Sequence, residues 1–301
     1  VMIGTEVAKK LEHEDESEAL EQGLCSLSRV RDWYNLEGDV SIFTHEMVDA
    51  DAAFSAALMS IVRPDAEIFL VPADTVVDRE GSLAVDMISG ENGVKGFEEG
   101  SAFGELTRIL TRLGVIPPRL FTRFADHLNL TDSGKRCNDR IALPGLVLSW
   151  RYAGLDDMTI VSRAHEILSG MMTGMEENRT RVNKSRNLPI KDGIALNLTS
   201  GGHDRKTLAR RGAYMVVVQH EGSGQSVILT SRGQRAGLDL NEVSNQLPDK
   251  WFIHPSGFLA CYGSRKAPKS PAESGIPLEG LCKIIRDWLV STLGYVPEAV
   301  I

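Results

Sequence analysis

The residues best suited to chemistry are one histidine and two aspartates at the end of a predicted strand. In VSIFTHEMVDADAAFSAAL (residues 40–58), a hydrophobic strand ends at His45, a short loop carries Asp49 and Asp51, and a helix of small residues follows. Ligands bind at the carboxyl ends of parallel strands. One imidazole and two carboxylates crowded there suit Mn²⁺ or Mg²⁺, because a cation removes their mutual repulsion. The structural alternative makes Asp51 the N-cap of the helix and Asp49 a turn residue.

Two further aspartates end predicted elements in the same way. Asp86 ends the apolar strand LAVD, and Asp132, followed by Ser133 and Gly134, lies at a helix terminus in FADHLNLTDSG. An acid at the end of a buried strand is placed at the rim where ligands bind. Asp86 also fits a structural cap.

Alternating short strands and helices must position these residues. The sequence predicts strands over 40–45, 67–71 and 83–87, and helices over 52–62, 101–113 and 117–128, the last opened by two prolines. Strands separated by helices indicate an α/β domain with a parallel sheet. We expect this domain to span residues 39–178, after a helical N-terminal extension over residues 1–38.

A second, smaller α+β domain is predicted over residues 179–301. A helical stretch over 155–178 leads into a basic, polar segment, 179–191, which favours a boundary because little of it can be buried. Beyond it the pattern predicts strands over 213–220, 226–231 and 251–261, and a closing amphipathic helix over 277–293.

Composition indicates a globular protein with an uneven charge distribution. Of the 301 residues, 42% are hydrophobic and 25% are charged, and no apolar run approaches the roughly 18 residues of a membrane span. Four widely spaced cysteines favour free thiols in a reducing, cytoplasmic location. Residues 1–178 carry 16 basic and 31 acidic side chains, and residues 179–301 carry 17 and 10. An acidic half can hold metal ions and a basic half a polyanion, although a solvated acidic helix explains part of the difference.

The motifs resemble those of the DHH phosphoesterase superfamily, which includes RecJ nucleases, nanoRNases and family II inorganic pyrophosphatases. The nearest likeness is to the branch of the melanocyte-proliferating-gene exonuclease, and it covers roughly residues 39–262. The resemblance implies Mn²⁺ or Mg²⁺, with two ions about 3.5–4 Å apart bridged by Asp86. It implies catalytic roles for Asp49, Asp51 and Asp86. The implied metal ligands are His45, Asp49, Asp51, Asp86 and Asp132.

The sequence departs from this family in one motif. The Asp-His-His triplet that gives the family its name occurs nowhere, and its equivalent region is SGENGVKGFEEGS (residues 89–101). At least one imidazole ligand is therefore missing. The glycines around Lys95 allow backbone N–H groups and an ammonium to hold a phosphate, which makes Lys95 a candidate for substrate binding. A plain surface loop is the alternative.

The second domain supplies candidate anion contacts. A Gly-Gly-His triplet ends at His203 and is followed by Arg205, Lys206, Arg210 and Arg211. The segment FIHPSGFLA (residues 252–260) resembles a late His-x-x-Gly-Phe segment of the same branch, which implies that His254 and Gly257 contact the substrate. Guanidinium and ammonium groups suit phosphate recognition, although some of them serve only solubility. The candidate substrate-binding residues here are His203, His254, Gly257, Arg265 and Lys266.

Together these features favour a metal-dependent phosphoesterase, a hydrolase of the nuclease type. It would cleave a phosphodiester or phosphoanhydride in a nucleic acid or nucleotide with a metal-activated water. The alternative, which the missing triplet favours, is a catalytically degenerate protein that binds nucleotide or nucleic acid as a regulatory or complex subunit. The retained acids favour the enzyme, because unused carboxylates that repel one another cost stability. The sequence does not distinguish RNA, DNA and a small nucleotide as the substrate. A homodimer also stays possible.

Overall fold

The chain forms two compact units, residues 1–174 and 175–301, in a computed structural model. The structure describes residues 25–87, 93–96, 100–135, 142–199, 202–220, 224–263 and 276–294. Each unit is described by itself.

The first unit contains the predicted parallel sheet. Its strands are β1 (Ser41–His45), β2 (Glu67–Val71), β3 (Ser82–Val85) and β4 (Gly93–Val94). They lie in the order β2-β1-β3-β4, and every pair is parallel. Because β1 and β3 are neighbours, their carboxyl ends lie at the same edge, which confirms the predicted sheet type.

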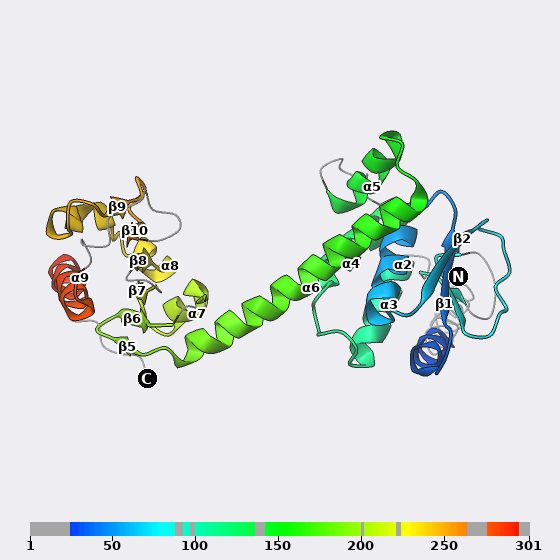
Figure 1. The fold of residues 1–301 in the computed structure, drawn as a ribbon, viewed down its shortest axis with the longest axis horizontal. Helices are drawn as coiled ribbons and strands as arrows, with labels where there is room; N and C mark the ends of the chain where they lie inside the picture. The colour runs from blue at the N-terminus through cyan, green and yellow to red at the C-terminus, as the bar shows by residue number, and fades with distance from the viewer. Residues whose placement is uncertain are drawn as a thin grey trace, which may run out of the picture. The chain divides into compact units, whose positions relative to one another are not determined.

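Helices α2 to α6 accompany this sheet (Figure 1). Their bounds are α2 (Ala50–Val62), α3 (Ala102–Arg112), α4 (Thr122–Asp132), α5 (Leu143–Tyr152) and α6 (Asp157–Asn187). Helix α4 begins later than predicted, because residues 117–120 form a turn in which Leu120 donates to the carbonyl of Pro117 and Arg119 has a φ of 67°. Helix α6 continues through most of the expected boundary segment, with an exposed Glu177–Arg181 pair one turn apart (3.1 Å).

An aromatic cluster fixes the helices around the site. Phe54 of α2 meets Phe124 of α4 edge to face at 4.6 Å between ring centroids. Phe103 of α3 packs against both of these rings, at 6.3 and 5.2 Å, and against Phe121 at 5.8 Å. All four rings are buried. Such pairs stabilise packing beyond their buried area, so the first turn of α3 is held close to α2.

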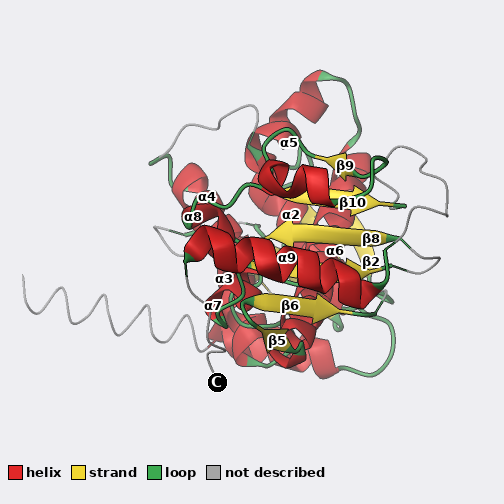
Figure 2. Cartoon of the chain, turned by 90° about the vertical axis from the view of Figure 1, so that its left-hand side faces the viewer, coloured by secondary structure: helices red, strands yellow, loops and turns green. Residues whose placement is uncertain are grey.

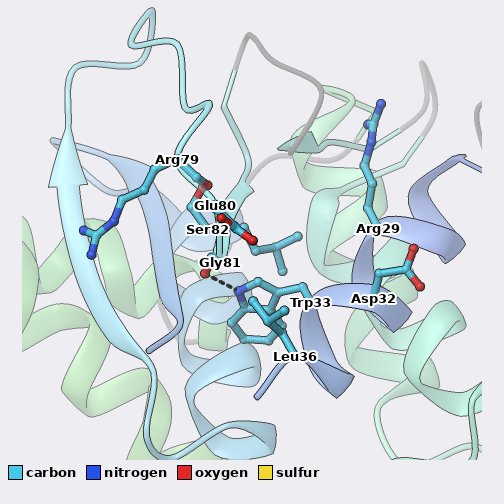
Figure 3. A pocket seen from close by; sticks show the side chains of 9 residues that line it. Arg29, Asp32, Trp33, Leu36, Arg79, Glu80, Gly81 and Ser82 are labelled. Carbon is cyan, nitrogen blue, oxygen red and sulfur yellow. Dashed lines mark hydrogen bonds between the residues drawn. The ribbon is translucent and has the colours of Figure 1, made fainter. Parts of the chain in front are cut away.

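A helix over residues 25–35 covers the opposite edge of the sheet, where β1 and β3 begin. Trp33, 5% exposed, donates from Nε1 to the carbonyls of Ser41 (3.2 Å) and Gly81 (3.1 Å). A pocket of about 310 Å³ lies beside this tryptophan and Leu36 (Figure 3). Since β1 rises about 3.3 Å per residue, this pocket lies roughly 13 Å from the strand end that carries His45.

The second unit is the predicted α+β domain. Its strands are β5 (Ile190–Lys191), β6 (Ile194–Asn197), β7 (Met215–Gln219), β8 (Gln225–Leu229), β9 (Phe252–Ile253) and β10 (Leu259–Tyr262). They form a mixed sheet in the order β5-β6-β7-β8-β10-β9, with only β6 and β7 parallel among the described strands. The single strand predicted over 251–261 is a hairpin, because Gly257 has a φ of 62° and turns the chain between β9 and β10.

Helices cover both faces of this second sheet. They are α7 (Arg205–Arg210), α8 (Ser231–Arg235), the 3₁₀ segment η2 (Leu240–Gln246) and α9 (Leu278–Leu293). Helix α9 crosses one face (Figure 2) and buries Leu281, Ile285 and Trp288 in a core with Val217. Leu208 of α7 belongs to a separate core with Val216 and Val218, which alternate with Val217 along β7 and so face the other side of the sheet. Among the described helices, none combines the length and apolar character required to cross a membrane.

Replacing Trp33 tests whether the helix over 25–35 is part of the first fold. We expect Trp33→Ala to lower the free energy of unfolding by about 3–5 kcal/mol, because a buried indole is lost. Trp33→Phe keeps a ring but removes the donor to two carbonyls, so about 1–2 kcal/mol is expected. Urea denaturation measures both values. A loss for Trp33→Ala below about 1 kcal/mol would show that this helix adds little to the unit.

Candidate metal centre

The sheet register brings His45 and Asp86 together. Phe43 of β1 lies opposite Ala84 of β3, so His45, two residues on, is level with Asp86. The His45 Nε2 atom lies 3.4 Å from Oδ2 of Asp86, with both side chains largely buried. The pairing follows from the parallel ladder itself, since each residue comes at the end of its strand.

A backbone carbonyl sets the tautomer of His45. Its Nδ1 atom lies 2.8 Å from the Glu46 carbonyl oxygen. A carbonyl only accepts hydrogen bonds, so Nδ1 carries one proton, and without a metal ion the second proton, on Nε2, is directed at the Asp86 carboxylate. The hydrogen bond to Asp86 raises the pKa of His45 to about 9, against the lowering by burial. A metal ion can replace the second proton, and a carbonyl on Nδ1 is the usual orienting partner of a metal-binding histidine.

Asp49 completes a three-ligand cluster with His45 and Asp86. One potential ligand atom from each residue lies within 4.8 Å of the other two. Asp49 is also the N-cap of α2, since its Oδ1 accepts from the Ala52 amide at 3.0 Å. The cap predicted as an alternative for Asp51 is thus made by Asp49. Capping fixes this carboxylate at the rim and leaves its other oxygen outside that hydrogen bond.

The backbone at Asp86 turns sharply where β3 ends. Its φ of 52° is in the left-handed region, which aspartate tolerates better than most residues, and its amide donates to the Val94 carbonyl at 3.0 Å. Burial raises the pKa of Asp86, with a further rise from the charge of Asp49 and an opposing effect of His45. Burial of this carboxylate thus favours its neutral form unless positive charge lies beside it.

Asp157 holds the loop between His45 and Asp49, and sequence analysis missed it. Its Oδ2 accepts from the Met47 amide (2.6 Å) and its Oδ1 from the Val48 amide (3.1 Å). Met47 has a φ of 56°, so the loop adopts a conformation that needs such support. Asp157 is the first residue of α6 and lies about a hundred residues along the chain. In the sequence, Asp157 looks like any acidic residue in the first turn of a helix, so nothing marks it as a loop contact.

The second aspartate of the motif, Asp51, is engaged by another helix. It is 2% exposed, and its two oxygens accept from the amides of Ala102 (2.6 Å) and Phe103 (2.8 Å) at the start of α3. Ser55 donates to the same carboxylate at 3.3 Å. Burial raises the pKa of Asp51, as does the charge of Asp86. Asp51 thus lies beside the three-ligand cluster and anchors the amino end of α3.

Asp132 and Lys95 extend the charged rim. Asp132 is the last residue of α4, and its pKa is raised by burial and by the charges of Asp86 and Asp49. Lys95 follows β4 directly, and its charge lowers the pKa of both Asp86 and Asp132. The structure therefore brings ligand atoms of His45, Asp49 and Asp86 together, and places Asp51, Asp132 and Lys95 close enough to act on these carboxylates through their charges.

His203 of the second unit is held as a neutral donor. Asn197 Nδ2 lies 3.4 Å from its Nδ1, and because an amide nitrogen only donates, the ring proton is on Nε2. Burial, with the nearby charges of Arg205 and Lys184, lowers the pKa of His203 to about 4. An N–H donor among cationic groups suits an anion.

His254 is arranged in the same way, while Gly257 packs against the chain itself. The Ser256 amide donates to Nδ1 of His254 at 3.1 Å, which leaves the proton on Nε2. A Cβ at Gly257 would lie 1.7 Å from Oδ1 of Asp239, and the φ of 62° is in the left-handed region, so packing and backbone conformation both favour glycine here. The predicted Arg265 and Lys266 lie outside the described residues.

The donor set of the first unit fits a hard divalent cation. One imidazole and carboxylate oxygens, with no thiolate among the described ligands, suit Mn²⁺ or Mg²⁺. Such an ion would compensate the charge of the carboxylates whose pKa values are raised, and would bind His45 through Nε2.

Comparisons with known proteins return distant structural similarities. RecJ of Thermus thermophilus in complex with Mg²⁺ has 12% identity and a TM-score of 0.34 over 91% of this chain and 53% of RecJ, so the chain spans about half of that protein. An exopolyphosphatase-related protein from Bacteroides fragilis has 11% identity and a TM-score of 0.27, with 89% and 97% covered. An exonuclease RecJ bound to manganese has 12% identity and a TM-score of 0.28, with 91% of this chain and 95% of that chain covered. These values are too low to carry an argument about function. No family model and no curated protein matches the sequence.

Replacing Asp157 tests its support of the metal loop. In Asp157→Asn the side chain no longer offers two acceptor oxygens to the Met47 and Val48 amides, so we expect Mn²⁺ affinity to fall about tenfold or more. Isothermal titration calorimetry measures it. The control is Asp156→Asn, because Asp156 immediately precedes α6 and its carboxylate accepts from Thr159 in the first turn of that helix. Equal affinities in the two variants would contradict a positioning role.

The protonation of His203 gives a second test. Since its folded pKa is about 4 and the unfolded value is about 6.5, unfolding takes up a proton between these pH values. The stability contribution of the neutral ring is therefore complete above pH 6.5 and is lost as pH falls toward 4. NMR titration of the His203 ring should show no protonation at pH 5.5. A midpoint near 6.5 would show that the ring is not shielded.

Proposed function

We propose that this chain is a divalent-metal-dependent phosphoesterase. The observation that carries the proposal is the three-ligand cluster of His45, Asp49 and Asp86, whose potential ligand atoms lie within 4.8 Å of one another at the carboxyl edge of a parallel sheet. That edge is where open α/β sheets bind ligands. The likeness of the motifs to the DHH superfamily supports the same reaction class.

A bound Mn²⁺ or Mg²⁺ would supply an activated water and polarise a phosphoryl oxygen. Three residues of the chain would hold this ion. His45 offers Nε2 because Nδ1 is occupied by a carbonyl, and Asp49 and Asp86 offer oxygens fixed by a helix cap and a strand end. Lys95 adds a positive charge at the same rim, which attracts the non-bridging oxygens of a phosphate.

The substrate we propose is a phosphodiester or phosphoanhydride of a nucleic acid or nucleotide. The second unit supports this through two histidines that each present an Nε2 donor, His203 and His254. Arg205 lies over the ring of Phe258 at 6.0 Å, and that ring contacts His254 at 4.5 Å between centroids. A cation and a donor gathered on one surface fit a phosphate group.

The test is hydrolysis by the full chain with Mn²⁺, using short RNA and DNA oligonucleotides, a dinucleotide and pyrophosphate. Asp49→Asn should lower turnover about a thousandfold or more, because a ligand worth several kcal/mol of transition-state stabilisation is lost. The matched control is Asp126→Asn, an exposed aspartate on α4, which should retain activity.

Two outcomes would contradict the phosphoesterase. Undiminished turnover in Asp49→Asn would remove the cluster from the reaction. Binding of Mn²⁺ and nucleotide without hydrolysis of any substrate would instead establish the degenerate binding protein.

A further inference from the structure

The first unit provides charge compensation that a second metal ion would otherwise supply. Its rim gathers four carboxylates, from Asp49, Asp51, Asp86 and Asp132, of which Asp51 is 2% exposed and the Asp86 side chain is largely buried. Three of the rim residues (His45, Asp49 and Asp86) surround one point closely enough to bind a single cation. The two remaining carboxylates, Asp51 and Asp132, are therefore the ones available to a second ion.

Asp51 already has a source of positive potential. Both of its oxygens accept from first-turn amides of α3, at 2.6 and 2.8 Å, and the side chain is 2% exposed. The amino end of a helix carries unsatisfied N–H groups and about half a positive charge. The aromatic contacts of Phe103 hold that helix end in place. A carboxylate compensated in this way does not require a cation.

Lys95 supplies a full positive charge next to the other carboxylates. The β3–β4 register pairs Val85 with Val94, so Lys95 comes level with Asp86, and the Asp86 amide donates to the Val94 carbonyl. The charge of Lys95 acts on Asp132 as well as on Asp86. The sequence from 87 to 101 contains no histidine or cysteine, and its glutamates (Glu91, Glu98 and Glu99) lie outside the described residues.

We propose that this chain holds one divalent ion, between His45, Asp49 and Asp86, and that the α3 amides and the Lys95 ammonium replace a second cation. This deepens the proposed function and rests on it for its role in catalysis. Asp51 is then a positioning residue for α3, and Lys95 compensates Asp86 and Asp132. A lysine ammonium can bind phosphate oxygens, but unlike a metal ion it cannot coordinate a water molecule and activate it.

The experiment counts Mn²⁺ on the full chain. The metal-free protein is titrated with Mn²⁺ alone by calorimetry, its metal content is determined by elemental analysis, and electron paramagnetic resonance distinguishes an isolated ion from an exchange-coupled pair. We expect one ion per chain with the spectrum of an isolated ion. Two ions per chain, or a coupled spectrum, would overturn the proposal.

Variants at Lys95 test its part. In Lys95→Met the carboxylates lose a competing positive charge, so we expect Mn²⁺ affinity to rise about fivefold or more, or a second ion to be taken up. Lys95→Arg keeps the charge and should match the native chain. Since Lys95 is exposed, neither change should impair folding. Unchanged or weaker affinity in Lys95→Met would overturn the compensating role of Lys95.

Asp51→Asn tests the other half. The amide cannot accept from both α3 amides as a carboxylate does, so hydrogen exchange at Ala102 and Phe103 should accelerate while the chain still binds one ion. Loss of the ion in a folded Asp51→Asn would make Asp51 a ligand and overturn its assignment. If this variant does not fold, the number of ions bound by the native chain and the comparison of Lys95→Met with Lys95→Arg decide.

These measurements separate this inference from the proposed function, because none requires turnover. One ion without hydrolysis would refute the phosphoesterase and leave the single-ion centre standing. Hydrolysis with two ions would do the reverse. Absence of Mn²⁺ uptake would refute both.

Discussion

The constraint on which the first unit depends is the crowding of carboxylates at one edge of a parallel sheet. Asp49, Asp51, Asp86 and Asp132 act on one another's charges, and burial raises the pKa of the last three. Like charges in a poorly solvated place must be compensated or protonated. The fold supplies compensation from three kinds of group: the His45 ring, the α3 amides and Lys95. The rest of the unit is arranged so that these groups reach the acids.

Histidine tautomers separate the two chemistries of the chain. In His45 the Nδ1 atom donates to a carbonyl, so Nε2 is free to bind an ion. In His203 and His254 the Nδ1 atom accepts from an N–H group, so Nε2 carries a hydrogen and suits an anion. Residue type alone does not distinguish these roles. The neighbouring backbone or amide group decides which ring nitrogen carries the proton, and the proposed cation site and phosphate contacts differ in this respect.

Local patterns in the sequence predicted those parts of the site that depend on local structure. Strand periodicity placed His45 and Asp86 at strand ends, and the parallel sheet then set their proximity. The roles of Asp157 and Asp51 escaped prediction, because their partners lie about 110 and 51 residues away and leave no local signature. The hairpin of β9 and β10 was missed for a different reason: the turn residues Pro255, Ser256 and Gly257 were present, but the apolar residues on both sides matched one continuous strand.

In the proposed single-ion centre, Lys95 stands where the resemblance to the DHH superfamily would place a histidine pair, and the two differ in electrostatic terms. Neutral imidazoles bind an ion but bring no charge, so a segment without them holds a second cation poorly and leaves Asp86 and Asp132 uncompensated. A lysine after β4 restores the positive charge without a metal. An ammonium cannot activate water, so under the proposed function activation would fall to the ion of the three-ligand cluster, and Lys95 would hold phosphate oxygens. Three of the four acids then have partners of their own in the fold: Asp49 caps α2, Asp51 accepts from the α3 amides, and Asp86 lies beside His45.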